Sequence, residues 1–229
     1  MRRALLFPLL GLACLLGGQK VGVIIKTVGD VQVIPANQST AIVARPGTAL
    51  EDQDLIKTGE NGFATAVYLD DRSQVKIAPN SELNFGGNRT SRGINKKVSV
   101  SYGTLRATVS KQHGKEFLIA TPTSVASVKG TDFIVVADPD SGDSFVILEG
   151  IVEVTNNVTG ISQTVTENQT ANSTPDGSVD VTTTNEEDIP ETDVTGEQGE
   201  TPESNEREIR IEMTNPDGTI KELIIRFHL

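Results

Sequence analysis

The chain of 229 residues contains no tryptophan, two tyrosines, seven phenylalanines, two histidines and one cysteine. So few aromatic side chains provide no array on which sugars or nucleic-acid bases could stack. Catalysis by Ser-His-Asp needs a histidine, and a zinc site needs clustered His and Cys, which this sequence barely supplies. The formal net charge of −11 also disfavours nucleic acid, because phosphate contacts require positive fields. The composition therefore favours a protein that is not an enzyme and that carries no cofactor and no metal.

Only the N-terminus contains a long apolar run. Met1-Arg2-Arg3 precedes apolar residues 4–16, and Gly17-Gly18 follow them. Such a run is about the length of the central region of a secretory signal and is too short to span a bilayer. We predict a signal peptide over residues 1–18 and an exported protein, periplasmic or extracellular, without a transmembrane segment in the mature chain.

The single cysteine, Cys14, lies inside this predicted signal peptide. Leu12-Ala13-Cys14 resembles a lipoprotein cleavage box, so a lipid anchor through Cys14 is an alternative. Gly11 stands where Leu is preferred, and Leu15-Leu16 continue the apolar run. Cleavage near Gly18 is therefore favoured, and it leaves a mature chain without a thiol or a disulfide.

From Val21 to about Val181, short runs of alternating apolar and polar residues are separated by Gly, Asp, Asn and Pro. Val, Ile and Thr dominate these runs, and β-branched side chains favour strands because they pack well on a pleated surface. Alternation bounded by turn residues indicates an all-β sandwich, barrel or solenoid. The expected strands lie at 21–25, 31–33, 63–69, 73–77, 98–100, 103–109, 117–119, 133–136, 145–148 and 151–154.

A glycine opens a strand at five places in this region. They are Gly29, Gly62, Gly103, Gly130 and Gly150. Their unequal spacing excludes a regular solenoid repeat. Each glycine can supply a positive φ or a close backbone approach at a corner between stacked layers. We predict an all-β domain over residues 21–181, with stacked short strands in a β-sandwich or an irregular β-solenoid-like core.

Residues 182–206 break the strand pattern. Residues 181–206 carry nine acidic side chains and no basic one, and large apolar residues are almost absent. Such a segment buries too little surface to offset the entropy lost on ordering. We predict a disordered acidic linker over residues 182–206.

The last segment, residues 207–229, alternates again on both sides of the turn sequence Asn215-Pro216-Asp217-Gly218. This pattern predicts a C-terminal β-hairpin with one apolar face. Because a lone hairpin is marginally stable in water, it must dock on something. It either returns to its own domain as an edge pair or presents a surface to a partner, formed by Leu223, Ile225 and Phe227.

Five segments resemble the FecR domain family of bacterial envelope proteins, and they follow the family's order. They are the strand pair from Val23 to Val33, residues 47–59, residues 62–83, residues 121–133 and the closing strand 148–154. The most specific is TPTSVASVKGTDF at 121–133, which is similar to the family's TPTA.A.VRGT.F signature. The departures are Lys129 in place of Arg, and Gln53 and Arg72 where turn glycines are usual. They leave the geometry of these turns open.

The resemblance covers residues 21–175 and implies a periplasmic domain. The iron-transport regulators of this family carry a cytoplasmic anti-sigma region and a transmembrane helix before the domain. Here the predicted export signal runs directly into the first strand, so we expect the domain alone, without the sigma-regulating activity. We expect the signature residues to have structural roles rather than to form a surface that binds a ligand or a partner. These residues are Thr121, Pro122, Thr123, Val128, Lys129, Gly130, Thr131 and Phe133.

Candidate chemical groups are few. His113 lies in an expected hairpin tip and His228 near the C-terminus, and neither belongs to a nucleophile motif. The acidic sequences Asp138–Asp143 and Asp70-Asp71 each fall between strands, so hairpin turns are favoured over a calcium loop or a carboxylate pair. Residues 89–129 carry eight basic side chains against Glu116 alone. They are Arg89, Arg92, Lys96, Lys97, Arg106, Lys111, Lys115 and Lys129.

This basic stretch is either a solvated face of alternating strands or a site for an anionic envelope polymer or the chain's own acidic tail. Three functions follow as hypotheses. The first is a non-catalytic binding or scaffold domain of the bacterial cell envelope, with an envelope protein or an anionic polymer as partner. The second is a periplasmic signalling component that contacts a receptor or regulator. The third and weakest is a protein that binds or processes envelope glycans.

Overall fold

The computed structural model describes residues 18–112, 115, 117–192, 206–214 and 219–228. These residues form β-strands almost throughout, which confirms the all-β prediction. The predicted signal peptide and Cys14 lie outside the described residues, apart from Gly18. Among the residues described, there is no helix that has both the length and the apolar character needed to cross a membrane.

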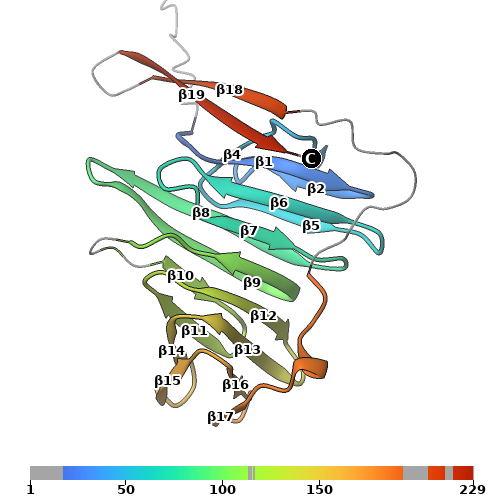
Figure 1. The fold of residues 1–229 in the computed structure, drawn as a ribbon. Helices are drawn as coiled ribbons and strands as arrows, with labels where there is room; N and C mark the ends of the chain where they lie inside the picture. Colours follow the sequence, from blue (N-terminus) through green and yellow to red (C-terminus); the bar gives the residue numbers. More distant parts are fainter. Residues whose placement is uncertain (1–17, 113–114, 116, 193–205, 215–218, 229) are drawn as a thin grey trace, which may run out of the picture.

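The strands stack in two facing sheets, from β1 and β4 at one end to β15 and β17 at the other (Figure 1). The first sheet has the order β4 (Ala49–Glu51), β1 (Lys20–Val28), β6 (Phe63–Tyr68), β7 (Gln74–Ile77), β9 (Gly93–Thr108), β12 (Asp132–Asp138), β13 (Gly142–Glu149), β16 (Gln169–Ser173) and β17 (Val179–Thr183). The second has the order β3 (Ile42–Val43), β2 (Val31–Ile34), β5 (Asp54–Thr58), β8 (Glu82–Thr90), β9, β10 (Phe117–Ala120), β11 (Ser124–Val128), β14 (Ile151–Asn156) and β15 (Ser162–Thr166).

Strand β9 belongs to both sheets. Its first part pairs with β8 and, in parallel, with β10, whereas its last part pairs with β7 and β12. The strand changes sheet near Gly103, whose φ is +101° and where a Cβ would lie 2.5 Å from the Cα of Ser81. The two runs expected at 98–100 and 103–109 are therefore one continuous strand, because glycine at this corner lets the chain bend without losing its pairing.

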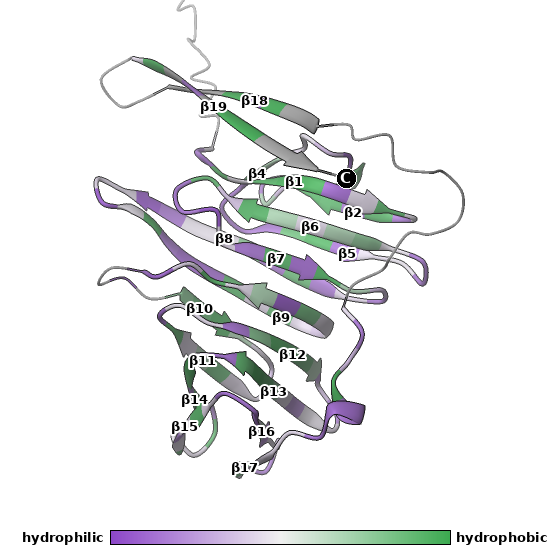
Figure 2. Cartoon of the chain, in the orientation of Figure 1, coloured by the Kyte–Doolittle hydropathy of each residue, from purple (hydrophilic) through white to green (hydrophobic). Residues whose placement is uncertain are grey.

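The core between the sheets consists mainly of Val, Ile, Leu and Ala. Five of the few aromatic side chains are fully buried in the molecule: Tyr68, Phe85, Phe117, Phe133 and Phe145. Hydrophilic residues gather at turns and along the projecting end of β8 (Figure 2). The sequence did not predict the short strands β3, β4 and β5. It also did not predict three regions rich in Gly, Ser, Asn and Thr, which are β8, β11 and the group β15 to β17.

The ordered body continues beyond the predicted boundary at residue 181. Strand β17 pairs with β16 as far as Thr183, the short 3-10 helix η1 covers Glu186–Asp188, and Thr192 is only 5% exposed. The prediction of a linker beginning at residue 182 is corrected, because backbone pairing and burial order the chain to Thr192 despite its polar composition. Residues 193–205 lie outside the described residues.

The C-terminal strands β18 (Glu206–Thr214) and β19 (Ile220–His228) pair with each other in antiparallel register. They lie at the end of the stack formed by β1, β2 and β4 (Figure 1). Ile211 and Ile225 are each 7% exposed and belong to the hydrophobic cluster of the main core. This strand pair therefore docks on its own domain and covers one end of the core.

Candidate functional site

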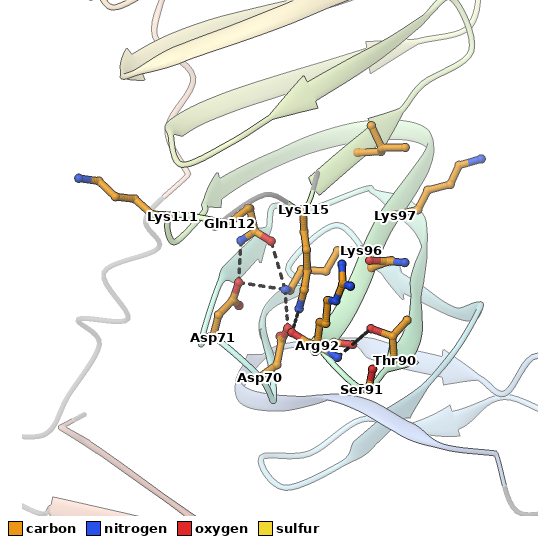
Figure 3. A pocket seen from close by; sticks show the side chains of 13 residues that line it. Asp70, Asp71, Thr90, Ser91, Arg92, Lys96, Lys97, Lys111, Gln112 and Lys115 are labelled. Atoms are coloured by element: carbon orange, nitrogen blue, oxygen red, sulfur yellow. Dashed lines mark hydrogen bonds and ion pairs between the residues drawn. The ribbon is translucent and has the colours of Figure 1, made fainter.

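An open pocket of about 1220 Å³ lies where three connections meet. They are the turn between β6 and β7, the tip of the β8–β9 hairpin and the segment that follows β9 (Figure 3). Its lining contains five basic and two acidic side chains. The lining residues are Asp70, Asp71, Thr90, Ser91, Arg92, Gly93, Asn95, Lys96, Lys97, Lys111, Gln112, Lys115 and Leu118.

Lys96 forms the floor of this pocket, and its side chain is completely buried. Its Nζ lies 2.9 Å from the Oδ2 atoms of both Asp70 and Asp71. The same ammonium group donates at 3.4 Å to Oε1 of Gln112 and to the carbonyl oxygen of Ile94. A buried charge is tolerated only when it is paired and hydrogen-bonded, and Lys96 meets both conditions.

An aromatic cluster lies beneath Lys96. Its Nζ lies 5.3 Å from the ring centroid of Tyr68, a cation–π distance. Tyr68 stacks on Phe85 with 4.2 Å between centroids and meets Phe117 edge-on at 5.6 Å. Burial, reinforced by the nearby carboxylates, raises the pKa of Tyr68 well above its usual value. The neutral phenol donates a hydrogen bond of 2.8 Å to the carbonyl oxygen of Gly86.

Gln112 joins the segment after β9 to the β6–β7 turn. Its Nε2 donates at 2.6 Å to Oδ2 of Asp71 and at 2.8 Å to the carbonyl oxygen of Ser110. Burial alone would raise the pKa of Asp71, but hydrogen bonds from Ser73, Lys96 and Gln112 outweigh it and lower this pKa below its usual value. Asp71 therefore remains an ionised partner for Lys96 at neutral pH.

The remaining cations surround this floor. Arg92, Lys97 and Lys111 are exposed, and none of them forms an ion pair or a side-chain hydrogen bond within the described part of the chain. Lys97 and Lys111 extend away from the floor to opposite sides (Figure 3). Lys115 donates to the carbonyl oxygen of Arg92 and thereby joins the segment after β9 to the hairpin tip. The pocket thus has a neutralised floor and a positively charged rim.

Five members of the basic stretch 89–129 therefore line one pocket. The other three do not line it: Arg106 pairs with Asp132 through two hydrogen bonds of 2.9 and 2.8 Å, Arg89 donates to the carbonyl oxygen of Lys20, and Lys129 lies outside the lining. The sequence did not predict the buried ion pairs of Lys96. The sequence did contain one indication of burial. Lys96 lies two residues from both Ile94 and Val98, so in a strand it shares their inward-facing side.

The first half of the family signature surrounds a buried carboxylate. Oδ2 of Asp143 accepts hydrogen bonds from the hydroxyl of Thr121 at 2.5 Å, from the backbone N–H of Thr123 at 2.9 Å and from the Thr123 hydroxyl. Pro122 between them is exposed. Asp143 is 3% exposed, and its Oδ1 has no hydrogen-bond partner, nor does Oγ of the neighbouring Ser124.

The second half of the signature packs in the core and braces the pocket. Val128 and Phe133 are fully buried. The backbone N–H of Gln112 donates to the carbonyl oxygen of Lys129, and Thr131 exchanges two backbone hydrogen bonds with Val109. Gly130, between them, has a φ of +144°. The signature backbone thus holds the start of the segment that carries Lys111 and Gln112.

The acidic sequence Asp138–Asp143 was expected to be one hairpin turn. The turn between β12 and β13 is present, and Asp138 accepts hydrogen bonds within it from Asp140 and Ser141. Asp143, however, lies on β13 and faces the core, because strand pairing resumes at Gly142. In the part of the chain that the structure describes, no three His, Cys, Asp or Glu side chains gather closely enough to hold a metal ion.

The predicted partner surface on the C-terminal hairpin is only partly described. Ile225 is buried in the core cluster, whereas the side chains of Leu223 and Phe227 lie outside the described residues. His113 is also outside them, and His228 is described only as the last residue of β19. Of these residues, Ile225 is described, and it does not line the pocket.

The fold and the site together define a two-sheet all-β domain with an open basic pocket on one side. Residues 54–153, from β5 into β14, match the family described as FecR protein. The resemblance found in the sequence is thereby confirmed over this range. The matched range includes every residue of the pocket lining.

Two crystal structures of one protein from Parabacteroides distasonis ATCC 8503, at 2.50 and 1.65 Å resolution, are also similar. That protein is described as a candidate anti-sigma factor. In each case the TM-score is 0.49 and the sequence identity 20%, and the match covers 56% of this chain and 59% of the other. This chain therefore spans little more than half the length of that protein. No curated protein shows significant similarity to the chain.

Proposed function

We propose that this chain is a non-catalytic binding domain exported to the bacterial cell envelope, and that it binds an anionic partner at the basic pocket. The observation that supports this most directly is the rim of Arg92, Lys97 and Lys111, cations without a partner among the described residues. Exposed cations around a concave surface attract and orient an anionic partner, even when the whole protein is acidic.

The arrangement of the titratable groups favours binding over catalysis. A general acid or base must be free to exchange a proton with a substrate. The acidic groups of the pocket, Asp70 and Asp71, are instead each held in an ion pair by the buried Lys96. The signature residues support the same interpretation, because their contacts are to the core, to Asp143 and to the backbone behind the pocket. We infer a structural role for them.

A photoreactive residue placed at Lys97, in bacteria that produce the chain, tests this function. We expect cross-links to an envelope molecule that are lost when Lys111→Glu is added. Thr164, exposed on β15 and outside the pocket lining, is the matched control position and should give few products. Equal yields at the two positions, or intermolecular products at Phe227 with none at Lys97, would overturn the proposal.

A periplasmic signalling role is a second candidate, and the FecR match favours it. In that case the anionic partner is a receptor or a regulator, and pocket variants change the transcription of target genes. Transcript profiles of cells carrying Lys97→Glu and Lys111→Glu decide between the two roles. A binding or scaffold role alone predicts unchanged transcription, whereas a signalling role predicts the same change as deletion of the chain.

A further inference from the structure

The position of the cations around the pocket limits the kind of anion that it can accept. Lys97 projects from β9 on one side, Lys111 projects from the segment after β9 on the other, and Arg92 lies at the hairpin tip. A single small anion is bound by donors that converge on one point, such as backbone N–H groups at a helix N-terminus. Divergent cations instead suit several negative charges spaced along one ligand.

The size of the pocket points the same way. Its volume of about 1220 Å³ exceeds the range of about 300–1000 Å³ that is usual for small-molecule sites. Thr90, Ser91 and Asn95 add neutral hydrogen-bonding groups beside the rim, and Leu118 is the only large apolar residue among the described residues of the lining. Hydroxyl and amide groups between cations fit a chain whose backbone carries donors and acceptors between its charges.

Two other polyanions fit less well. Among the described residues no aromatic side chain lines the pocket, because Tyr68, Phe85 and Phe117 are buried beneath it, so these residues offer a sugar ring no surface on which to stack. A long anionic polymer or a lipid surface would also extend past the rim. There it would meet a protein of net charge −11, at distances where repulsion is only partly screened at physiological salt. A short acidic segment, confined to the pocket, avoids this repulsion.

From these observations we propose that the pocket binds a short, extended, acidic peptide segment of a protein partner. The carboxylates of the segment contact Arg92, Lys97 and Lys111, while Thr90, Ser91 and Asn95 lie within reach of its backbone. This inference rests on the proposed function and specifies the partner at the same site. Lys96 does not contact the peptide; it holds the floor together through Asp70 and Asp71.

The test is a titration of the purified chain with a fluorescent peptide of alternating Glu and Ser residues. We expect binding that weakens as salt is added and that is lost when every Glu of the peptide is replaced by Gln. Lys97→Glu with Lys111→Glu should weaken it about tenfold or more. The control variant, Lys20→Glu with Arg45→Glu, changes the net charge by the same amount at exposed positions outside the pocket lining. It should change the affinity for the peptide less than about twofold.

Three results would overturn the inference. They are equal weakening by both double variants, equal binding of the Gln peptide, and tighter pocket-dependent binding of dextran sulfate or of vesicles containing phosphatidylglycerol than of the acidic peptide. The last result would leave the proposed function standing with a different partner class. Loss of the cross-links at Lys97 in cells would instead remove the proposed function itself, so the two failures are distinguishable.

Discussion

Two regions of the molecule stabilise aspartate carboxylates in different ways. In the half with the pocket, Asp70 and Asp71 lie against the ammonium group of Lys96. In the half with the signature, Asp143 is surrounded by the hydroxyl and backbone donors of Thr121 and Thr123, and no cation contacts it among the described residues. One site balances charge with charge, whereas the other relies on hydrogen-bond donors alone.

Because of this difference, we expect the pocket to serve binding and the Asp143 network to serve stability. Charge balance at the pocket floor uses a single lysine for two carboxylates, so the other lining cations remain available at the rim. The Asp143 network is buried, and it connects the segment before β11 to β13. We therefore expect variants of the first site to disturb both stability and ligand binding, and variants of the second to disturb stability alone.

The largest effect is expected from Lys96→Met, which keeps much of the side-chain volume but leaves two carboxylates unpaired. Breaking a buried ion pair from one side costs about 3–5 kcal/mol of unfolding free energy, and we expect the lower end of this range because Asp70 and Asp71 remain partly exposed. Urea denaturation measures the change. Adding Asp70→Asn and Asp71→Asn should restore much of the loss, since no unpaired charge then remains at the pocket floor. Lys97→Met, at the exposed neighbour, is the control and should alter stability little. A similar loss in both variants would contradict the role of the ion pair.

At Asp143, we expect the negative charge to contribute less to stability than the oxygen atom that accepts the hydrogen bonds. Asp143→Ala removes the acceptor of the Thr123 backbone N–H and leaves the two threonine hydroxyls only the carbonyl oxygens of Ser124 and Ser173, so it should cost about 2–3 kcal/mol of unfolding free energy. Asp143→Asn keeps an acceptor oxygen and should cost about 1 kcal/mol or less. Peptide binding at the pocket should be unchanged in the Asn variant. If Asn proves as damaging as Ala in urea denaturation, the carboxylate charge is needed, and the contrast between the two sites fails.

The smallest change in stability is expected from a substitution in the turn that carries Asp70 and Asp71. Arg72 follows them with a φ of +61°, a left-handed conformation that costs an L-residue about 1–2 kcal/mol. Arg72→Gly should relieve this strain and, after the added entropy of the unfolded chain, raise stability by about 0.5–1 kcal/mol. Arg72→Ala removes the same side chain without relieving the backbone. Equal thermal midpoints for the Gly and Ala variants would show that the turn is not strained.

Much of the fold was predictable because it depends on local pattern. Alternating β-branched residues located most strands of the body, and four of the five glycines that were expected to open strands have a positive φ: Gly29, Gly103, Gly130 and Gly150. At Gly62, the fifth, a Cβ would collide with the backbone oxygen of Asp30. Gln53 and Arg72 stand where the family has glycine, and both keep the left-handed conformation, with φ values of 66° and 61°. Pairing on either side of these turns outweighs the local strain.

The site was less predictable, because its parts are far apart in the sequence. Asp71 and Gln112 are separated by 41 residues, and Thr123 and Asp143 by 20. Each acidic pair had a sufficient local explanation as a turn. The Asp70-Asp71 turn is present, but only the stacking of layers placed Lys96 against these two carboxylates, and Asp143 beside the signature threonines.

The sequence by itself determined the class of fold, the FecR resemblance and a basic stretch of undecided purpose, since alternation, turn residues and charge are properties of neighbouring residues. Only the tertiary structure decided which cations gather at one pocket and which one is buried. It also decided that the C-terminal hairpin covers its own core, with Ile211 and Ile225 buried there. The physical reason is that pairing between distant strands fixes which side chains meet, and burial then selects the charges that must be neutralised.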